Sequence, residues 1–439
     1  MRLWSPYAWL GGDEPVADVL LSIDADRVAA VTAGVPAPAD AERLDGLLLP
    51  GLANAHSHAF QRALRGRTER EPGSFWSWRR QMYSLAGALD PDSMLALSRA
   101  AFGEMALAGI TVVGEFHYVH HRPGGGQYSD PNAMASAVIE AAREAGVRLT
   151  LLDACYLDGG LEPDPVQERF FDANAEAWIS RVELLQGGPV VRIGAAVHSM
   201  RAVQPEAAAV VAAWAASRSL PLHAHVSEQP AENQACLEVY GATPVELFHF
   251  EGALPERFTA VHATHVTERD IELLGEARAC CCLCPTTERS LADGIGPARA
   301  LREAGCALTI GTDSNGVIEP FEEVRAVELD ERLGTGVRSG VSGGALLAGA
   351  TTEGYRSLGW DSGGAIREGA LADLVSVATD GVRLAGTPSR DLIDAAVFAG
   401  GAADVRDVVV GGRFVVRDGA HVSLDVPREL ASALSGAGW

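Results

Sequence analysis

Eight short apolar segments separated by Ala-rich stretches constrain the fold of this 439-residue chain more than any other feature of its sequence. The apolar segments cover residues 47–56, 109–117, 147–156, 189–199, 220–228, 258–265, 279–285 and 306–314. The stretches between them predict amphipathic helices at residues 93–109, 130–146, 205–219, 266–278 and 295–305. Strands that alternate with helices indicate a parallel sheet, and eight such strands make a (β/α)8 barrel. A doubly wound open sheet is the alternative, but no G-x-G-x-x-G motif follows any of the segments.

The two ends of the chain contain short strand-like runs. These runs cover residues 18–24, 27–34, 372–380, 395–400 and 404–422. Within the last of them, the sequence VVVGGRFVV predicts a hairpin that turns at Gly411 and Gly412.

This difference between the middle of the chain, where strands alternate with helices, and its strand-rich ends predicts two domains. We expect residues 1–48 and 371–439 to form one small β-sandwich domain beside a barrel of residues 49–370. The connections at residues 66–80 and 122–132 are longer than usual for this kind of barrel, so they are candidate lid or pocket loops.

The charge balance limits the partners of the protein. With 35 Lys and Arg residues against 58 Asp and Glu residues, the net charge is −23, which argues against nucleic acid or an anionic membrane as a partner. The chain contains no lysine at all, so a Schiff-base lysine, a P-loop lysine and a carboxylated lysine that bridges two metal ions are all excluded. An acidic substrate would need locally placed Arg side chains.

The cysteines and the N-terminus bear on the cellular compartment. The odd number of seven cysteines, with Cys280, Cys281, Cys282 and Cys284 crowded together, disfavours a disulfide framework. Cys281 and Cys284 form a CxxC pattern, but small-residue filling of a buried strand is the favoured interpretation. The N-terminus lacks the apolar segment of a signal peptide, and no apolar run reaches ~18 residues. We therefore expect a cytoplasmic protein.

His56 and His58 follow the first apolar segment. Residues i and i+2 of a strand leave the same face, so both imidazoles can enter one pocket and bind a metal ion. Two hydrogen-bonded histidines at a strand end are the alternative. Polar residues also end the other segments, where a barrel carries its chemistry: His117, Tyr118, His198, His225, Glu228, His262 and Asp313. A cluster of three His and one Asp fits a single Zn²⁺ with one position open for water; its members are His56, His58, His225 and Asp313.

Longer motifs connect the chain to a known family. They are NAHSHAFQRAL, SFWSWRRQMY, GEFHYVHH, HSMRAV, HAHVSEQ, VHATH, LCPTTERSLADG and TDS. With them the chain resembles the amidohydrolase superfamily over nearly its whole length, and within it closely resembles the formimidoylglutamate deiminase family. The His-x-His and Asp motifs are typical of the whole superfamily. SFWSWRRQMY, GEFHYVHH and HSMRAV carry the narrower resemblance.

The resemblance implies a fold, an activity and a set of site residues. The fold is a metal-dependent hydrolase barrel, and the activity is hydrolysis of N-formimino-L-glutamate to N-formyl-L-glutamate and ammonia by a metal-activated water that attacks the formimino carbon. The implied metal ligands, for one Zn²⁺ per chain, are His56, His58, His225 and Asp313. The implied catalytic residues are Glu228, His262 and Asp313. The implied substrate-binding residues are Gln61, Arg79, Tyr118, His198 and Arg201. The family is typically homodimeric, and it usually has His where this chain has Asn315.

The chemistry of such a reaction accounts for these residue types. Asp313 can move a proton from the water to the leaving amine, Glu228 can protonate the imine nitrogen, and His262 can stabilise the tetrahedral intermediate. Two substrate carboxylates suit two guanidinium groups, for which Arg79 and Arg201 are the candidates. Each has a plainer alternative, namely a surface charge for Arg79 and a helix-start salt bridge for Arg201.

Two other functions stay open at this point. A related mononuclear deaminase that acts on a purine-like or pyrimidine-like ring would have aromatic stacking and amide contacts in place of two Arg side chains. A metal-binding barrel without turnover would have lost Glu228, His262 or Asp313, and all three are present.

Overall fold

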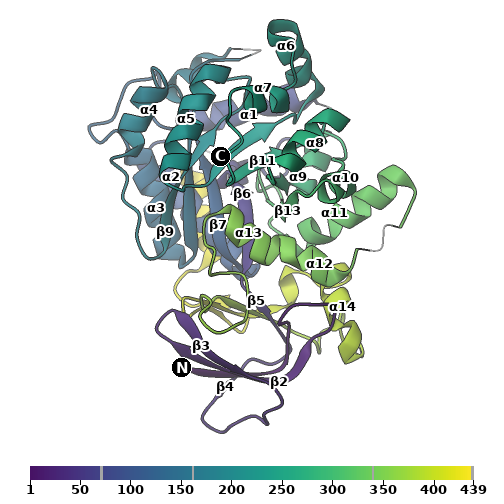
Figure 1. Cartoon of the computed structure of the whole chain (residues 1–439). Helices are drawn as coiled ribbons and strands as arrows, with labels where there is room; N and C mark the ends of the chain where they lie inside the picture. The colour runs from purple at the N-terminus through teal and green to yellow at the C-terminus, as the bar shows by residue number, and fades with distance from the viewer. Residues whose placement is uncertain (70–72, 161–162, 339–340, 437–439) are drawn as a thin grey trace.

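The computed structural model describes residues 1–69, 73–160, 163–338 and 341–436, which fold into a barrel and a separate sheet (Figure 1). The barrel is an eight-stranded parallel sheet in sequential order. Its strands are β6 (Leu52–Ser57), β7 (Ile110–His117), β8 (Arg148–Cys155), β9 (Val191–Val197), β10 (Leu222–Val226), β11 (Phe258–His262), β12 (Cys280–Leu283) and β13 (Ala307–Ile310). Each coincides with one of the eight apolar segments, apart from Ser57 at the end of β6, which confirms the predicted barrel.

The first and last strands of the barrel meet just beyond β13. Ser57 and Asp313 form an isolated parallel bridge, in which the His58 N–H donates to the Asp313 carbonyl at 2.8 Å. The Asp313 N–H donates to the His56 carbonyl at 3.0 Å. The barrel is therefore nearly closed, and its closing contact contains three of the predicted site residues.

Helices surround the barrel, and the five predicted ones are confirmed. They are α2 (Pro91–Leu107), α3 (Ala133–Ala145), α5 (Pro205–Ser217), α8 (Glu268–Glu276) and α10 (Ala298–Glu303). The other α-helices are α1 (Phe75–Ala88), α4 (Ala175–Val182), α6 (Pro230–Tyr240), α7 (Pro244–Phe250), α9 (Pro285–Leu291), α11 (Pro320–Thr335), α12 (Gly343–Ala348), α13 (Gly354–Ser357), α14 (Leu392–Phe398) and α15 (Val426–Gly436). Shorter turns are η1 (Ala59–Leu64), η2 (Pro165–Arg169), η3 (Gly349–Glu353), η4 (Ser389–Asp391) and η5 (Ala402–Asp404). Within the described residues, no helix combines the length and the apolar character that a membrane crossing requires.

The second sheet combines both ends of the chain, as predicted. Figure 1 shows its N-terminal strands, in purple, beside its C-terminal strands, in yellow, below the barrel. The nine strands are β1 (Arg2–Ala8), β2 (Val16–Asp24), β3 (Arg27–Thr32), β4 (Glu42–Arg43), β5 (Leu47–Pro50), β14 (Leu374–Val377), β15 (Val405–Val410), β16 (Arg413–Arg417) and β17 (Ala420–His421). The predicted hairpin joins β15 to β16, and Gly411 and Gly412 have the positive φ angles, 55° and 72°, that a tight hairpin turn needs.

Three local predictions were wrong or incomplete. The first apolar segment divides at Gly51, so that β5 pairs with β14 in the small sheet and only β6 belongs to the barrel. Residues 395–398 belong to helix α14 instead of a strand, because Leu392, Ile393, Ala396 and Val397 bury one helical face. The segment 66–80 is only partly a loop, since α1 begins at Phe75, and residues 70–72 lie outside the described residues. The bounds predicted for the two domains stay predictions.

A buried ion pair joins the barrel to the small sheet. The Arg148 guanidinium, at the start of β8, donates to both carboxylate oxygens of Asp373 at 2.7 and 3.1 Å. Asp373 also accepts from the Tyr355 hydroxyl at 2.9 Å and from the Gly411 N–H at 2.7 Å. This buried carboxylate has hydrogen-bond partners on both of its oxygens, and it forms a polar connection between the two sheets.

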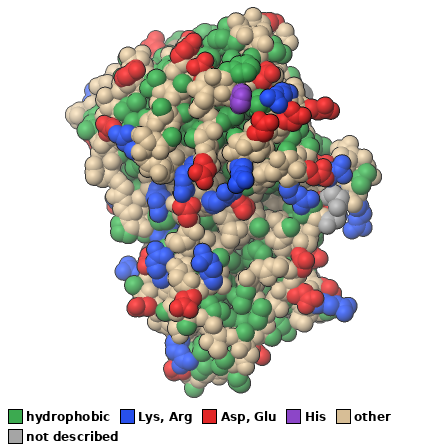
Figure 2. Space-filling view, in the orientation of Figure 1, with side chains coloured by type: hydrophobic (Ala, Val, Ile, Leu, Met, Phe, Trp, Pro, Cys, Tyr) green, Lys and Arg blue, Asp and Glu red, His purple; other side chains and the backbone are tan. Residues whose placement is uncertain are grey.

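We expect Asp373→Ala to lower the free energy of unfolding by about 3–5 kcal/mol, because it leaves the Arg148 guanidinium buried without its carboxylate. Thermal unfolding followed by circular dichroism would measure this loss as a lower Tm. The matched control is Asp361→Ala, which removes an exposed pair with Arg257 and should cost about 0–1 kcal/mol. Figure 2 shows acidic and basic side chains close together at several places on one face of the molecule. Equal Tm values for the two variants would contradict this account.

Candidate functional site

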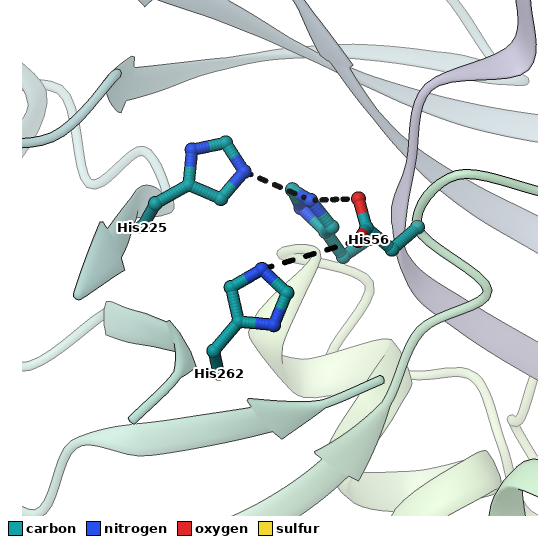
Figure 3. A group of neighbouring side chains, drawn as sticks. His56, His225 and His262 are labelled. Atoms are coloured by element: carbon teal, nitrogen blue, oxygen red, sulfur yellow. Dashed lines mark hydrogen bonds and ion pairs between the residues drawn. The ribbon is translucent and has the colours of Figure 1, made fainter. Parts of the chain in front are cut away.

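Four predicted site residues meet where the barrel closes. The Nε2 atom of His56 lies 3.2 Å from Asp313 Oδ1, and the Nε2 atom of His58 lies 3.4 Å from the same oxygen. His225, near the end of β10, places its Nε2 atom 3.2 Å from His56 Nε2. Figure 3 shows the rings of His225 and His262 directed toward His56. All four side chains of the predicted ligand set are thus brought together.

The outer ring nitrogens explain why these imidazoles face inward. His58 Nδ1 lies 2.8 Å from the Phe116 carbonyl, and His225 Nδ1 lies 2.9 Å from the His198 carbonyl. A carbonyl oxygen only accepts, so Nδ1 carries the proton and Nε2 directs a lone pair into the site. Three imidazole nitrogens and one carboxylate oxygen, with the rings of His58 and His225 oriented by backbone carbonyls, fit a Zn²⁺-type ion. The residues present therefore suit a single divalent cation.

Burial and charge keep this donor set deprotonated. Burial lowers the pKa of His56 to about 3, even though Asp313 opposes the shift. Burial likewise lowers the pKa values of His58 and His225. Burial alone would raise the pKa of Asp313, but the hydrogen bond and the charge interaction with His56, together with the other imidazoles, hold it well below its ordinary value. Because metal binding requires neutral imidazoles and an ionised carboxylate, the site is ready for an ion near neutral pH.

The backbone is strained where it turns away from the strand ends. Ser227, His262, Asp313 and Asn315 have positive φ angles of 52°, 70°, 46° and 54°. Residues other than Gly cost about 1–3 kcal/mol in such sparsely populated conformations, and they concentrate at functional sites. Asn tolerates this conformation best, and the Asn315 amide donates to Ser57 Oγ at 3.1 Å and to the Asp313 carbonyl at 3.0 Å. Asn315 therefore fastens the turn that carries Asp313.

Two further predicted residues flank the cluster. His262 Nε2 lies 3.8 Å from Glu228 Oε1 and 3.9 Å from Asp313 Oδ2, and its Nδ1 lies 3.2 Å from Glu288 Oε1. Burial lowers the pKa of His262, but the charge of Glu228 and the hydrogen bond to Glu288 outweigh it and raise the pKa to about 10. His262 is thus a charged donor among three carboxylates.

A cavity opens next to the cluster, and all five residues predicted to bind substrate line it. Its walls also contain many aromatic side chains, from α1 and from the segments that follow β7, β8 and η2. The lining residues are His58, Gln61, Phe75, Trp76, Trp78, Arg79, Met82, Tyr83, Tyr118, Tyr156, Gly159, Gly160, Phe170, His198, Arg201, Ala202, His225, Glu228 and Asp313. The segment predicted as a second pocket loop, residues 122–132, contributes nothing to this lining, whereas residues 75–79 form part of it.

The two Arg side chains differ in their partners. Arg79 donates from Nε to the Tyr83 hydroxyl at 2.6 Å, and within the described chain no carboxylate lies within 4.0 Å of its guanidinium. Arg201 donates from Nη2 to Glu228 Oε2 at 2.8 Å, and its Nε lies 3.9 Å from Glu232 Oε1. Both alternatives considered for Arg201 therefore hold at once, since it lines the cavity and also forms an ion pair.

Sequence reasoning overlooked several residues here. Tyr156 follows β8 directly, lines the cavity and accepts a hydrogen bond from Gln167 at 2.7 Å. Its position at the end of a predicted strand was a signal for it. Glu232 and Glu288 lie on helices after the strands, and neither was assigned a role, although Glu288 stands within the motif LCPTTERSLADG. His117 departs from the expected rim, because it lies in a separate buried group with His120 and Asp153.

The cysteines of β12 are buried and free, which confirms that they fill a strand.

Comparison with known proteins agrees with this geometry. The sequence profile of the Amidohydrolase family matches residues 47–415. Formimidoylglutamate deiminase from Pseudomonas aeruginosa is 36% identical over 419 residues, which cover 92% of each chain. A 5-methylthioadenosine/S-adenosylhomocysteine deaminase from Natronomonas pharaonis is 30% identical over 93% of this chain and 90% of its own. The crystal structure of an amidohydrolase from Brucella melitensis superposes with a TM-score of 0.92 at 33% identity, over all of both chains. The chain therefore belongs to the amidohydrolase family.

Proposed function

We propose that this protein hydrolyses the formimino group of N-formimino-L-glutamate to give N-formyl-L-glutamate and ammonia. One divalent ion, Zn²⁺ by its donor set, would be held by His56, His58, His225 and Asp313. The observation that carries the proposal is that Arg79 and Arg201 line the cavity beside this cluster, in a chain with a net charge of −23. The similarity to a formimidoylglutamate deiminase supports the same substrate.

The reacting groups are arranged for hydrolysis of an imine. A divalent ion in this cluster would lower the pKa of a bound water to about 7. Asp313 Oδ2 faces His262 and not His56 or His58, so this oxygen can take up a proton and return it to the leaving amine. Glu228 Oε1 is the oxygen that Arg201 does not bond, and it can carry a proton from the attacking water to the imine nitrogen. The His262 imidazolium can donate to the oxygen that becomes negative during attack.

The cavity offers a binding group for each substrate carboxylate. Arg79 would bind one of them, because a half-buried guanidinium beside aromatic rings gains from an anionic partner. Arg201 would bind the other through its Nη1 side, because its Nη2 already donates to Glu228. The Gln61 amide, which donates to the Tyr118 hydroxyl at 2.9 Å, would add neutral hydrogen bonds.

A ring deaminase is the second candidate. The aromatic wall of Phe75, Trp76, Trp78 and Tyr156 could stack on a planar base, and one relative is a 5-methylthioadenosine/S-adenosylhomocysteine deaminase. Ammonia release by the purified protein distinguishes the two candidates. We expect turnover of formiminoglutamate, with weaker turnover of formiminoaspartate. Turnover of guanine, cytosine or 5-methylthioadenosine in its place would favour the second candidate.

We expect metal analysis to find about one divalent ion per chain, because the chain has no lysine to bridge a second one. Asp313→Asn should abolish turnover while retaining part of the metal, since the amide oxygen can still coordinate but cannot accept the proton. Elemental analysis and ammonia assays on the same samples test both statements. Two tightly bound catalytic ions, or full activity of the variant, would contradict the assigned role of Asp313.

We expect Arg79→Ala to weaken productive binding of formiminoglutamate by roughly 2–5 kcal/mol in kcat/KM, because one substrate carboxylate would lose its charged partner in a cavity with little water. The matched control is Arg80→Ala, which removes the exposed neighbouring guanidinium and should leave kcat/KM unchanged. Equal kcat/KM values for wild type and Arg79→Ala would remove Arg79 from substrate binding.

A further inference from the structure

The first turn of α9 lies directly behind the cluster. This short helix begins with Pro285, immediately after β12, and its first turn carries Thr287 and Glu288. Both side chains are buried, with 2% and 5% of their surface exposed, and neither lines the cavity. They therefore cannot touch a substrate there, yet both contact residues of the site.

Glu288 turns its carboxylate back toward the strand ends. Its Oε1 atom accepts a hydrogen bond from the Cys284 N–H at 2.8 Å and lies 3.2 Å from His262 Nδ1. The first contact fixes the carboxylate against the start of its own helix. The second gives the outer nitrogen of His262 an acceptor, so the Nδ1 proton is held there and Nε2 points to the site.

His262 needs such support for two reasons. Its backbone adopts a positive φ of 70°, a conformation that persists only when the surroundings hold it. Its ring is 1% exposed and lies within 4 Å of carboxylate oxygens from Glu228 and Asp313. A half-turn of the ring about the Cβ–Cγ bond would put Cε1 in the place of Nε2, so that a carbon atom would face the reacting centre. Among the described residues, Glu288 makes the shortest contact with this imidazole.

Thr287 secures the other side of the site. Its hydroxyl lies 3.0 Å from Ser314 Oγ and accepts from the Ser314 N–H at 3.2 Å. It also donates to the Thr312 carbonyl at 3.3 Å. Because Thr312 and Ser314 flank Asp313, one helical turn contacts both His262 and the loop that bears Asp313.

We propose that Glu288 is a positioning residue of the active site, which accepts the Nδ1–H of His262 and so fixes the orientation of its ring. It acts through His262 and does not touch the substrate. This inference rests on the proposed function only in taking His262 as a group that faces the reacting atoms.

Steady-state kinetics of Glu288→Ala, Glu288→Gln and Glu323→Gln in the full-length protein test the proposal. We expect Glu288→Ala to lower kcat about 10–100-fold, the usual cost of losing such an outer partner, with KM and metal content unchanged. Glu288→Gln keeps an acceptor oxygen and should retain most of the activity. Glu323 is the matched control, because it is a buried carboxylate that accepts from the neighbouring Thr286 N–H at 3.0 Å without reaching the site. Its Gln variant should behave as wild type.

A second measurement separates this inference from the choice of substrate. Nitrogen NMR of metal-free protein labelled at His, with the His262 signal identified by its loss in His262→Asn, reports whether the Nδ1 proton is held in a hydrogen bond. We expect a slowly exchanging Nδ1–H signal in wild type and in Glu288→Gln, and loss of that signal in Glu288→Ala. If Glu288→Ala does not fold, Glu288→Asp, which withdraws the carboxylate from His262, replaces it.

Two results would overturn the proposal. One is an unchanged His262 signal and kcat in Glu288→Ala, and the other is an equal loss of kcat in Glu323→Gln, which would mean that the turn as a whole is damaged. If formiminoglutamate is not a substrate, the NMR result still decides whether Glu288 fixes His262.

Discussion

The parallel contact between Ser57 and Asp313 is the interaction on which the site depends. It joins the two ends of the barrel sheet, and the same backbone hydrogen bonds place His56 and His58 within 3.4 Å of the Asp313 carboxylate. The closure of the barrel and the assembly of the cluster are therefore one event.

Charge in this closed space is balanced locally. The cluster buries the carboxylates of Asp313, Glu228 and Glu288, and each faces an imidazole or a guanidinium. Burying an unpaired carboxylate would cost several kcal/mol, so the acids and bases must be placed together or not at all. The ion pair of Arg201 with Glu228 follows from this rule, and it links a residue proposed to bind substrate to one proposed to donate a proton.

The sequence predicted the direction of a side chain correctly where the periodicity of a strand determines it. His56 and His58 leave one face of a strand, and parallel strands end on one rim, so their meeting with His225 and Asp313 was predictable. The same alternation places His117 and its neighbour Phe116 on opposite faces of β7. Because the centroid of the Phe116 ring lies 4.4 Å from that of the His225 ring, on the inner face, His117 faces away from the rim where we expected it. The strand predicted at residues 395–400 was wrong, because a short apolar run fits a helix as well as a strand. The partner of Arg201 depends on side-chain conformation, which no spacing reveals.

The pairing of β5 with β14 has a consequence for how the protein is made. Strand β5 ends at Pro50, and its partner β14 begins at Leu374, so one edge of β5 has no partner until most of the chain has left the ribosome. At about 5–20 residues per second, this interval lasts on the order of tens of seconds. During translation the exposed edge is a template for wrong pairing, and the nascent chain must be protected there until its last strands emerge.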